Sequence, residues 1–173
     1  KKIAIFLENG VLEEENPNWE GDGVKVFTSQ PILTEGWNSH LVKFLDLASP
    51  GDYIAINAYL PRTEEIMEAL QKLREWIRQK TGRATTIGFG PRFLHSTGQL
   101  HKGGPSTALF IQITADPVED IEIPGMDKGL TFGILQRAQA MGDYEALVAR
   151  DRRILRLHLS TANDIHRIAE NLQ

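Results

Sequence analysis

One polar stretch, residues 88–105, concentrates residue types that hold anions and move protons. It contains two of the five histidines, His95 and His101, together with Lys102 and five glycines. A neutral imidazole transfers protons near pH 7, and an adjacent ammonium can hold a phosphate or stabilise a developing oxyanion. Connections of this length are longer than a compact domain usually uses, and they often carry function. We therefore expect the chemistry in this stretch.

Each of these residues also has an ordinary structural role. His101 and Lys102 form either a proton-transfer and anion-holding pair or a solvated loop dipeptide. His95 either donates to a ligand or caps a backbone turn. Arg92 either binds an anion bidentately or forms a surface salt bridge.

Three further polar residues of the stretch leave similar alternatives open. Ser96 and Thr97 either bind phosphate oxygens beside backbone N–H groups at a helix start, or one of them is simply the N-cap. Gln99 either holds a sugar hydroxyl or lies on the surface.

The glycines complete no P-loop or dinucleotide fingerprint. The remaining histidines show no pair at metal-ligand spacing and are expected to be structural: His40, His158 and His166.

Alternating strands and helices must position this stretch. The flanking runs Ala84–Ile87 and Ala108–Thr114 are apolar and β-branched, which predicts buried strands. Further strands are predicted at Val24–Thr28, Tyr53–Tyr59 and Ile154–Leu159, with a strand or loop at 121–124. Helices are predicted at about 35–47, 61–81, 130–141, 143–149 and 162–172, with Gly82 as the stop of the second. This order indicates an α/β domain with a largely parallel sheet, whose ligands collect at the carboxyl ends of strands. The polar stretch leaves from such an end.

The first 23 residues differ in character from the rest of the chain. We expect residues 1–23 to be a connector, with Lys2–Leu7 as a short strand or the tail of a preceding element. The acidic segment Glu13–Asn18, interrupted by a proline, predicts solvated chain and suggests a chain cut from a longer protein. Residues 24–173 are expected to form a single α/β domain.

Composition narrows the function classes. A chain of 173 residues with 41% hydrophobic residues can bury a core as one domain. The formal charge of −4 argues against a nucleic-acid partner. The absence of cysteine excludes disulfides and thiolate chemistry and suits a cytoplasmic protein. No apolar run approaches the roughly 18 residues that span a bilayer, so no membrane partner is expected.

The run GFGPRFLHSTGQLHKGGP, residues 88–105, is similar to the C-terminal region of bacterial bifunctional transaldolase/phosphoglucose isomerases. The similarity covers most of the chain, including the acidic connector and residues 20–23. Further matching segments are 51–53, 58–60, 110–114, 123–125, 131–133, 138–140 and 152–159. The resemblance implies a three-layer, flavodoxin-type sheet of sugar-isomerase (SIS) architecture, following a transaldolase barrel. It also implies aldose–ketose isomerisation of glucose 6-phosphate and fructose 6-phosphate, with no metal or organic cofactor.

The resemblance also implies site residues. Ordinary phosphoglucose isomerases carry a Gly-Gln-His element, then a strand ending Gln-Leu-Ile, then a helix of Ala-Gln type. Similar elements occur here in the same order at Gly98–His101, Phe110–Thr114 and Leu135–Ala140. This implies His101 as the ring-opening group, with Lys102 and Gln99 beside it. The inserted Leu100 and the longer gap before the strand leave His95 as a rival.

Other parts of the family pattern are absent from this sequence. The Asn-Pro-Phe-Asp-Gln-Pro-like run ending in a catalytic lysine does not occur, and no SIS phosphate loop or C2/C1 carboxylate base stands out. We therefore expect the C-terminal domain of a larger isomerase, incomplete alone, whose partners are a sugar phosphate, its other domains and a second copy. The alternative is a non-catalytic SIS-like module for sugar-phosphate binding or dimerisation. A catalytic role requires His95, Gln99, His101 and Lys102 to converge on one cleft.

Overall fold

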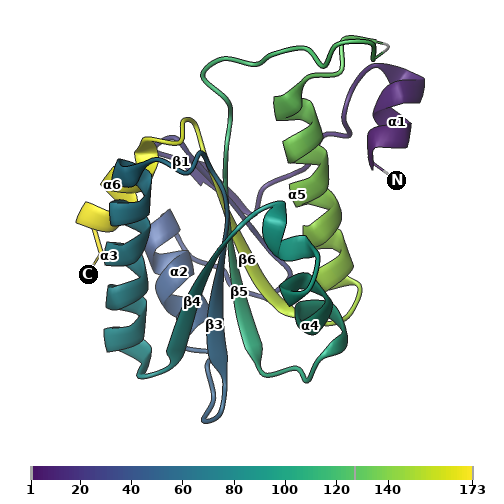
Figure 1. The fold of residues 1–173 in the computed structure, drawn as a ribbon. Coiled ribbons are helices and arrows are strands. Elements are labelled where there is room, and N and C mark those ends of the chain that lie inside the picture. Colours follow the sequence, from purple (N-terminus) through teal and green to yellow (C-terminus); the bar gives the residue numbers. More distant parts are fainter. Residues whose placement is uncertain (1, 127, 173) are drawn as a thin grey trace.

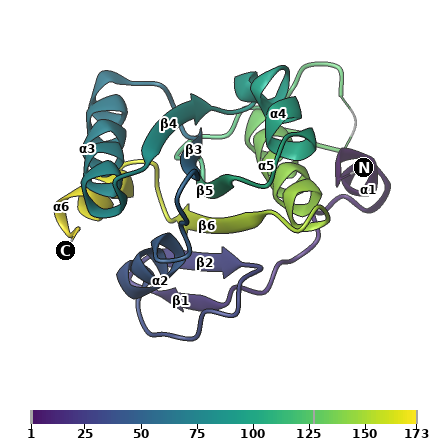
Figure 2. The same cartoon turned by 90° about the horizontal axis from the view of Figure 1, so that it is seen from below.

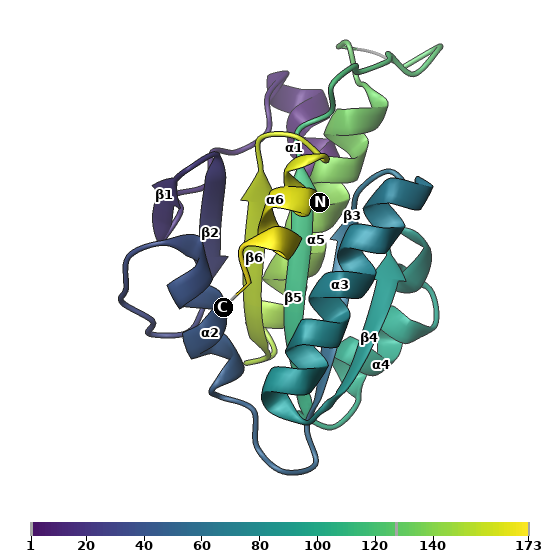
Figure 3. The same cartoon turned by 90° about the vertical axis from the view of Figure 1, so that its left-hand side faces the viewer.

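A six-stranded sheet forms the centre of the protein, with strand order β1-β2-β6-β5-β3-β4 (Figure 1). The structure is a computed structural model and describes residues 2–126 and 128–172. The strands are β1 (Trp19–Gly21), β2 (Val24–Thr28), β3 (Tyr53–Tyr59), β4 (Ala84–Phe89), β5 (Ala108–Ala115) and β6 (Arg153–Leu159). Strands β6, β5, β3 and β4 run parallel, whereas β2 pairs antiparallel with β6 and β1 extends that edge. Figure 3 shows this order from one edge to the other.

Helices cover both faces of the sheet and complete three layers (Figure 2). They are α1 (Lys2–Asn9), α2 (Trp37–Leu45), α3 (Glu64–Thr81), α4 (Thr97–Gly103), α5 (Phe132–Val148) and α6 (Asp164–Glu170), with a 3-10 turn η1 (Arg92–Leu94). Helices α2, α3 and α6 cover one face, and α4 and α5 cover the other. The predicted α/β class with a largely parallel sheet flanked by helices is confirmed.

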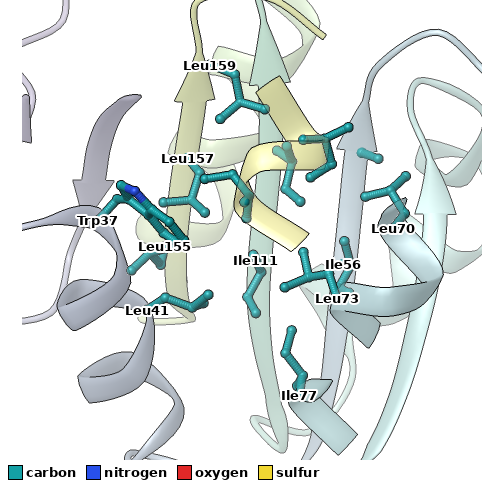
Figure 4. Packing of buried hydrophobic residues seen from close by; sticks show 14 of the residues in the cluster. Trp37, Leu41, Ile56, Leu70, Leu73, Ile77, Ile111, Leu155, Leu157 and Leu159 are labelled. Atoms are coloured by element: carbon teal, nitrogen blue, oxygen red, sulfur yellow. The ribbon is translucent and has the colours of Figure 1, made fainter. Parts of the chain in front are cut away.

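The main core lies between the sheet and the layer of α2, α3 and α6. Alternate strand residues such as Ile56, Ile111 and Leu157 are fully buried there, in one cluster with the apolar stripe of α3 and with Trp37 and Leu41 of α2 (Figure 4). Burying each such side chain contributes about 1.5–3 kcal/mol. Helix α3 begins at the N-cap Thr63, whose hydroxyl accepts from the Ile66 N–H, and ends at Gly82 with φ 65°.

Two elements differ from their sequence predictions. Of the two alternatives for Lys2–Leu7, the short strand is wrong, because this segment forms α1, beside α5 (Figure 1). Its buried residues Lys2 and Phe6 are one helical turn apart, so a helix buries both on one side. The two helices predicted at 130–141 and 143–149 are the single helix α5, because Gly142 and Asp143 continue the helix instead of ending it.

The polar stretch is also more ordered than a loop. After β4 the chain forms η1 and then α4 before it enters β5. The segment 121–124, predicted as a strand or loop, is a loop with one isolated bridge between Glu122 and Thr131. The division of the chain at residue 23 stays a prediction, although β1 lies before it and pairs with β2 after it.

Candidate functional site

His101 lies inside the protein, on the side of α4 that faces the sheet. Its ring centroid is 4.8 Å from that of Phe110 on β5 and 6.1 Å from that of Phe93 in η1. Burial lowers the pKa of His101 below its usual 6.5, while the nearby Asp143 carboxylate opposes this shift and the Lys102 ammonium adds to it. The imidazole is therefore neutral at pH 7.

Lys102 joins α4 to α5. Its Nζ lies 2.8 Å from Oδ1 of Asp143, whose side chain is 2% exposed. The guanidinium of Arg152, just before β6, donates to the backbone oxygens of Lys102, at 3.1 Å, and Gly104. These contacts fix the end of α4 and thereby the position of His101.

Two buried oxygens between the sheet and α5 lack hydrogen-bond partners among the described residues. They are the hydroxyl of Tyr59 and Oδ2 of Asp143. Burial raises the pKa of Tyr59, and the Asp143 charge raises it further, so the phenol is protonated. The Tyr59 ring packs edge-on against Phe93 at 5.6 Å between centroids. An unsatisfied buried polar group costs about 1–3 kcal/mol, and native proteins keep few of them outside functional places.

The other predicted site residues lie on the surface. These exposed residues are Arg92, His95, Ser96, Thr97 and Gln99. Ser96 occupies the N-cap position of α4, but its side chain makes no capping hydrogen bond. His95 and Gln99 therefore do not converge with the buried His101 on one cleft within the described part of this chain. The catalytic and substrate-binding roles of all seven residues stay predictions.

A cleft of about 540 Å³ lies elsewhere, between α5 and the carboxyl half of the sheet. None of the seven predicted site residues lines it. Its floor includes one row of polar side chains across four strands, because Tyr59 pairs in register with Thr114, Thr114 with His158, and His158 with Lys25. Arg156, one row below, also lines the cleft. The cleft lies at the carboxyl ends of β3, β5 and β6, whereas the stretch predicted to carry the chemistry follows β4, and its role stays a prediction.

His158 connects the floor of this cleft to its mouth. Its Nδ1 lies 2.9 Å from the Thr114 hydroxyl, and its Nε2 lies 3.5 Å from Oδ1 of Asp116. Burial lowers the pKa of His158, with the Asp116 carboxylate opposing the shift. Sequence reasoning classed His158 as structural. The signal that could have identified it is the spacing of polar residues at every second position near the ends of β3, β5 and β6.

The described residues form neither a metal-binding cluster nor a membrane-spanning helix. No group of three His, Asp or Glu side chains is placed to hold a metal ion. Among the helices of residues 2–126 and 128–172, none has the length and apolar character needed to span a membrane.

The fold is an α/β domain with a mostly parallel sheet flanked by helices and a polar cleft at the carboxyl ends of its central strands. No protein-family model matches the sequence. A glucose-6-phosphate isomerase of Thermus thermophilus is 31% identical over 90 residues, which cover 47% of this chain and 22% of that protein. A crystal structure of a hypothetical protein from the same organism has a TM-score of 0.58 at 22% identity over 77% of this chain. The chain spans 36% of that solved chain, and the likeness concerns the fold.

Proposed function

We propose that this chain is part of a sugar-phosphate isomerase that interconverts glucose 6-phosphate and fructose 6-phosphate. The observation that carries the proposal is the 31% identity to a glucose-6-phosphate isomerase, together with the motif at 88–105. The chain spans about a fifth of that relative, 22%, so the activity belongs to a larger assembly of which this domain supplies one part.

In this proposal, His101 opens the sugar ring. A neutral imidazole can take the proton of the anomeric hydroxyl and return it to the ring oxygen. The lowered pKa of His101 keeps the ring in the form that accepts a proton at pH 7. Lys102 is already paired with Asp143, so its role is to position α4.

The exposed side of α4 is where another part of the enzyme would pack. His95 and Gln99 lie there, and Leu100 is 56% exposed beside them. A second domain or a second copy covering this surface would bury Leu100 and bring further groups next to α4. The carboxylate that moves the proton between C2 and C1 would come from that partner. His101 lies on the opposite, sheet-facing side and is 5% exposed, so this proposal requires α4 to move away from Phe110 before substrate reaches the imidazole.

The test uses the complete natural polypeptide that carries this chain. The conversion of fructose 6-phosphate to glucose 6-phosphate is measured for the parent, His101→Gln and His95→Gln, with urea unfolding of each. Loss of general acid–base catalysis lowers turnover by about 10²–10⁴-fold. We expect this loss in His101→Gln; full turnover in His101→Gln would contradict its ring-opening role, and a loss confined to His95→Gln would assign that role to His95.

A second readout separates ring opening from a structural role. A tetrose 4-phosphate cannot close a ring, because its only suitable hydroxyl carries the phosphate. His101→Gln should therefore leave solvent deuterium exchange at its C2 unchanged. Equal loss with the hexose and the tetrose phosphate would mean that the substitution damages the site as a whole.

The alternative is a non-catalytic module for sugar-phosphate binding or dimerisation. The exposure of His95 and Gln99 favours it, because these groups do not meet His101. This alternative predicts that the complete polypeptide shows no turnover, while fructose 6-phosphate still shifts histidine resonances of the 173-residue chain in a saturable manner.

A further inference from the structure

Arg156 is a buried cation at the base of the 540 Å³ cleft. The residue is 2% exposed, and its guanidinium carbon lies 4.0 Å from the ring centroid of Phe27 and 4.8 Å from that of Tyr144. The two aromatic rings hold the planar group and favour its positive charge. Its Nε has no hydrogen-bond acceptor among the described residues. A buried guanidinium with an unused donor is a ready contact for an anion.

The present counter-ion of Arg156 comes from the acidic connector. Oε1 of Glu15 lies 2.8 Å from Nη2 of Arg156. The two groups form an ion pair, but the N–H bonds of Nη2 are not aligned with the carboxylate oxygen and donate no hydrogen bond to it. The ion pair persists because Coulomb attraction depends little on that angle. Glu15 therefore neutralises the charge of Arg156 but leaves N–H donors of the guanidinium unused.

Of the other carboxylates that line the cleft, Glu14 is exposed and three have partners of their own. Asp120 accepts hydrogen bonds from the start of α5, at Gly133 and Thr131. Asp116 faces His158, at 3.5 Å, and Glu13 pairs with the buried Lys2. Glu15 is therefore the carboxylate in this group that lies against Arg156.

The floor of the cleft supplies groups that suit hydroxyls. The row formed by Tyr59, Thr114, His158 and Lys25 carries O–H and N–H groups, and the Tyr59 hydroxyl has no partner among the described residues. A volume of about 540 Å³ is in the range of small-molecule sites. The site therefore combines one deep cation with several hydrogen-bonding groups.

We propose that this cleft binds a small polyol carrying a phosphate or carboxylate, whose anionic group replaces Glu15 on Arg156. The planar guanidinium matches both anions through two parallel hydrogen bonds. The hydroxyls of the ligand contact the polar row on the floor. The connector is then a built-in competitor, and ligand affinity is reduced by the fraction of time that Glu15 occupies Arg156. This site is separate from α4 and does not depend on the proposed isomerase function.

The test uses the 173-residue chain and two small probes, glycerol 1-phosphate and glycerate, with glycerol as the uncharged control. Binding is followed by NMR on the histidine ring resonances, assigned by single substitutions. The resonance of His158 should shift saturably with a charged probe, whereas those of His95 and His101 on the α4 side should not. The stronger of the two charged probes identifies the anion that the site prefers.

Glu15→Gln and Glu14→Gln form a matched pair of variants. Both remove one charge from residues that line the cleft, but Glu14 is exposed and is not paired with Arg156. We expect Glu15→Gln to tighten probe binding by about tenfold and Glu14→Gln to change it by less than about twofold. Arg156→Lys keeps the charge and should weaken binding, because it removes the planar fork.

Several outcomes would overturn the proposal. The first is that neither charged probe shifts the His158 resonance saturably, in the parent or in Glu15→Gln. Urea unfolding checks that both proteins are folded, so that this result is not a loss of structure. Another is an equal effect of Glu14→Gln and Glu15→Gln, which would indicate general charge only. A shift confined to His95 or His101 would place binding at α4 and would leave the isomerase proposal standing without this cleft.

Discussion

The ammonium of Lys102 lies 2.8 Å from the carboxylate of Asp143 and thereby joins α4 to α5 inside the protein. The Asp143 side chain is 2% exposed, and its second oxygen has no hydrogen-bond partner among the described residues. A carboxylate removed from water to this extent is tolerated because an opposite charge is next to it. The position of α4, and of His101 on it, depends on this pair.

Lys102→Met should lower the free energy of unfolding by about 3 kcal/mol, because it leaves the Asp143 charge buried and unpaired. Urea unfolding at pH 7 measures the effect. Lys102→Met combined with Asp143→Leu should recover most of the loss, since both charges are then removed. Lys25→Met is the control, because Lys25 and Glu20 are 3.4 Å apart but both largely exposed, and it should cost less than about 1 kcal/mol. Equal losses for the two lysine substitutions would contradict a buried-pair role.

Stability should fall as the pH drops below 6.5, the ordinary pKa of histidine. Burial lowers the pKa of His101 and of His158 in the folded chain, so the unfolded chain binds protons first as the pH falls. Where the unfolded state binds more protons, stability rises with pH. The stabilisation is therefore complete above pH 6.5 and is lost progressively below it, down to the folded pKa values.

His101→Phe tests this assignment, because a phenyl ring fits among Phe93 and Phe110 and does not titrate. The urea midpoint of this variant should change less between pH 7 and pH 5 than that of the parent. His158→Gln should flatten the same profile independently. An unchanged profile in both variants would mean that other groups govern the acid response.

Most of the sheet could be predicted because its strands are continuous apolar runs. Tyr53–Tyr59 and Val24–Thr28 have the predicted bounds. The three residues of β1 were missed, because Trp19–Gly21 is too short and polar to show alternation. The antiparallel pairing of β2 with β6 could not be predicted either, since Val24 and Leu159 are paired across most of the chain.

The candidate sites were harder to predict for a related reason. A concentration of polar residues in one stretch is visible locally, and it led to His101 and Lys102. The cleft instead depends on Thr114, His158 and Lys25, which are far apart in sequence and meet through strand register. Its charge pair depends on Glu15, from a connector expected to be solvated. Long-range pairing of this kind leaves no local pattern.

Gly90→Ala should destabilise the protein, and Gly142→Ala should stabilise it. A methyl group at Gly90 would lie 2.5 Å from the ring of Tyr59, which is 2% exposed and packed against Phe93. Overpacking of this kind costs about 1–3 kcal/mol. At Gly142, within α5, no atom outside its local helix backbone and chain neighbours lies within 4 Å, and alanine favours a helix by about 1 kcal/mol. Thermal unfolding of both variants checks the opposite signs, and a stabilising Gly90→Ala would show that Tyr59 moves freely.

Asp120→Ala should loosen the first turn of α5. The Asp120 carboxylate accepts from the Gly133 N–H at 2.7 Å and from the Thr131 hydroxyl, which in turn accepts from the Ile134 N–H at 3.1 Å. Asp120 therefore satisfies one orphan backbone donor directly, orients the Thr131 hydroxyl that satisfies a second, and places negative charge at the positive end of the helix. Losing such a cap costs about 1 kcal/mol.

Hydrogen exchange distinguishes a lost cap from general destabilisation. The amides of Gly133 and Ile134 should exchange faster in Asp120→Ala by a larger factor than amides in the middle of α5. Glu119→Ala is the control, because it removes the same charge one residue earlier, from an exposed side chain. Since carboxylates near a helix start act within its first turn, a charge effect alone would accelerate exchange similarly in both variants. Acceleration confined to Asp120→Ala would assign the effect to its two hydrogen bonds, and equal exchange in all three proteins would show that the cap contributes nothing to holding α5 beside the cleft.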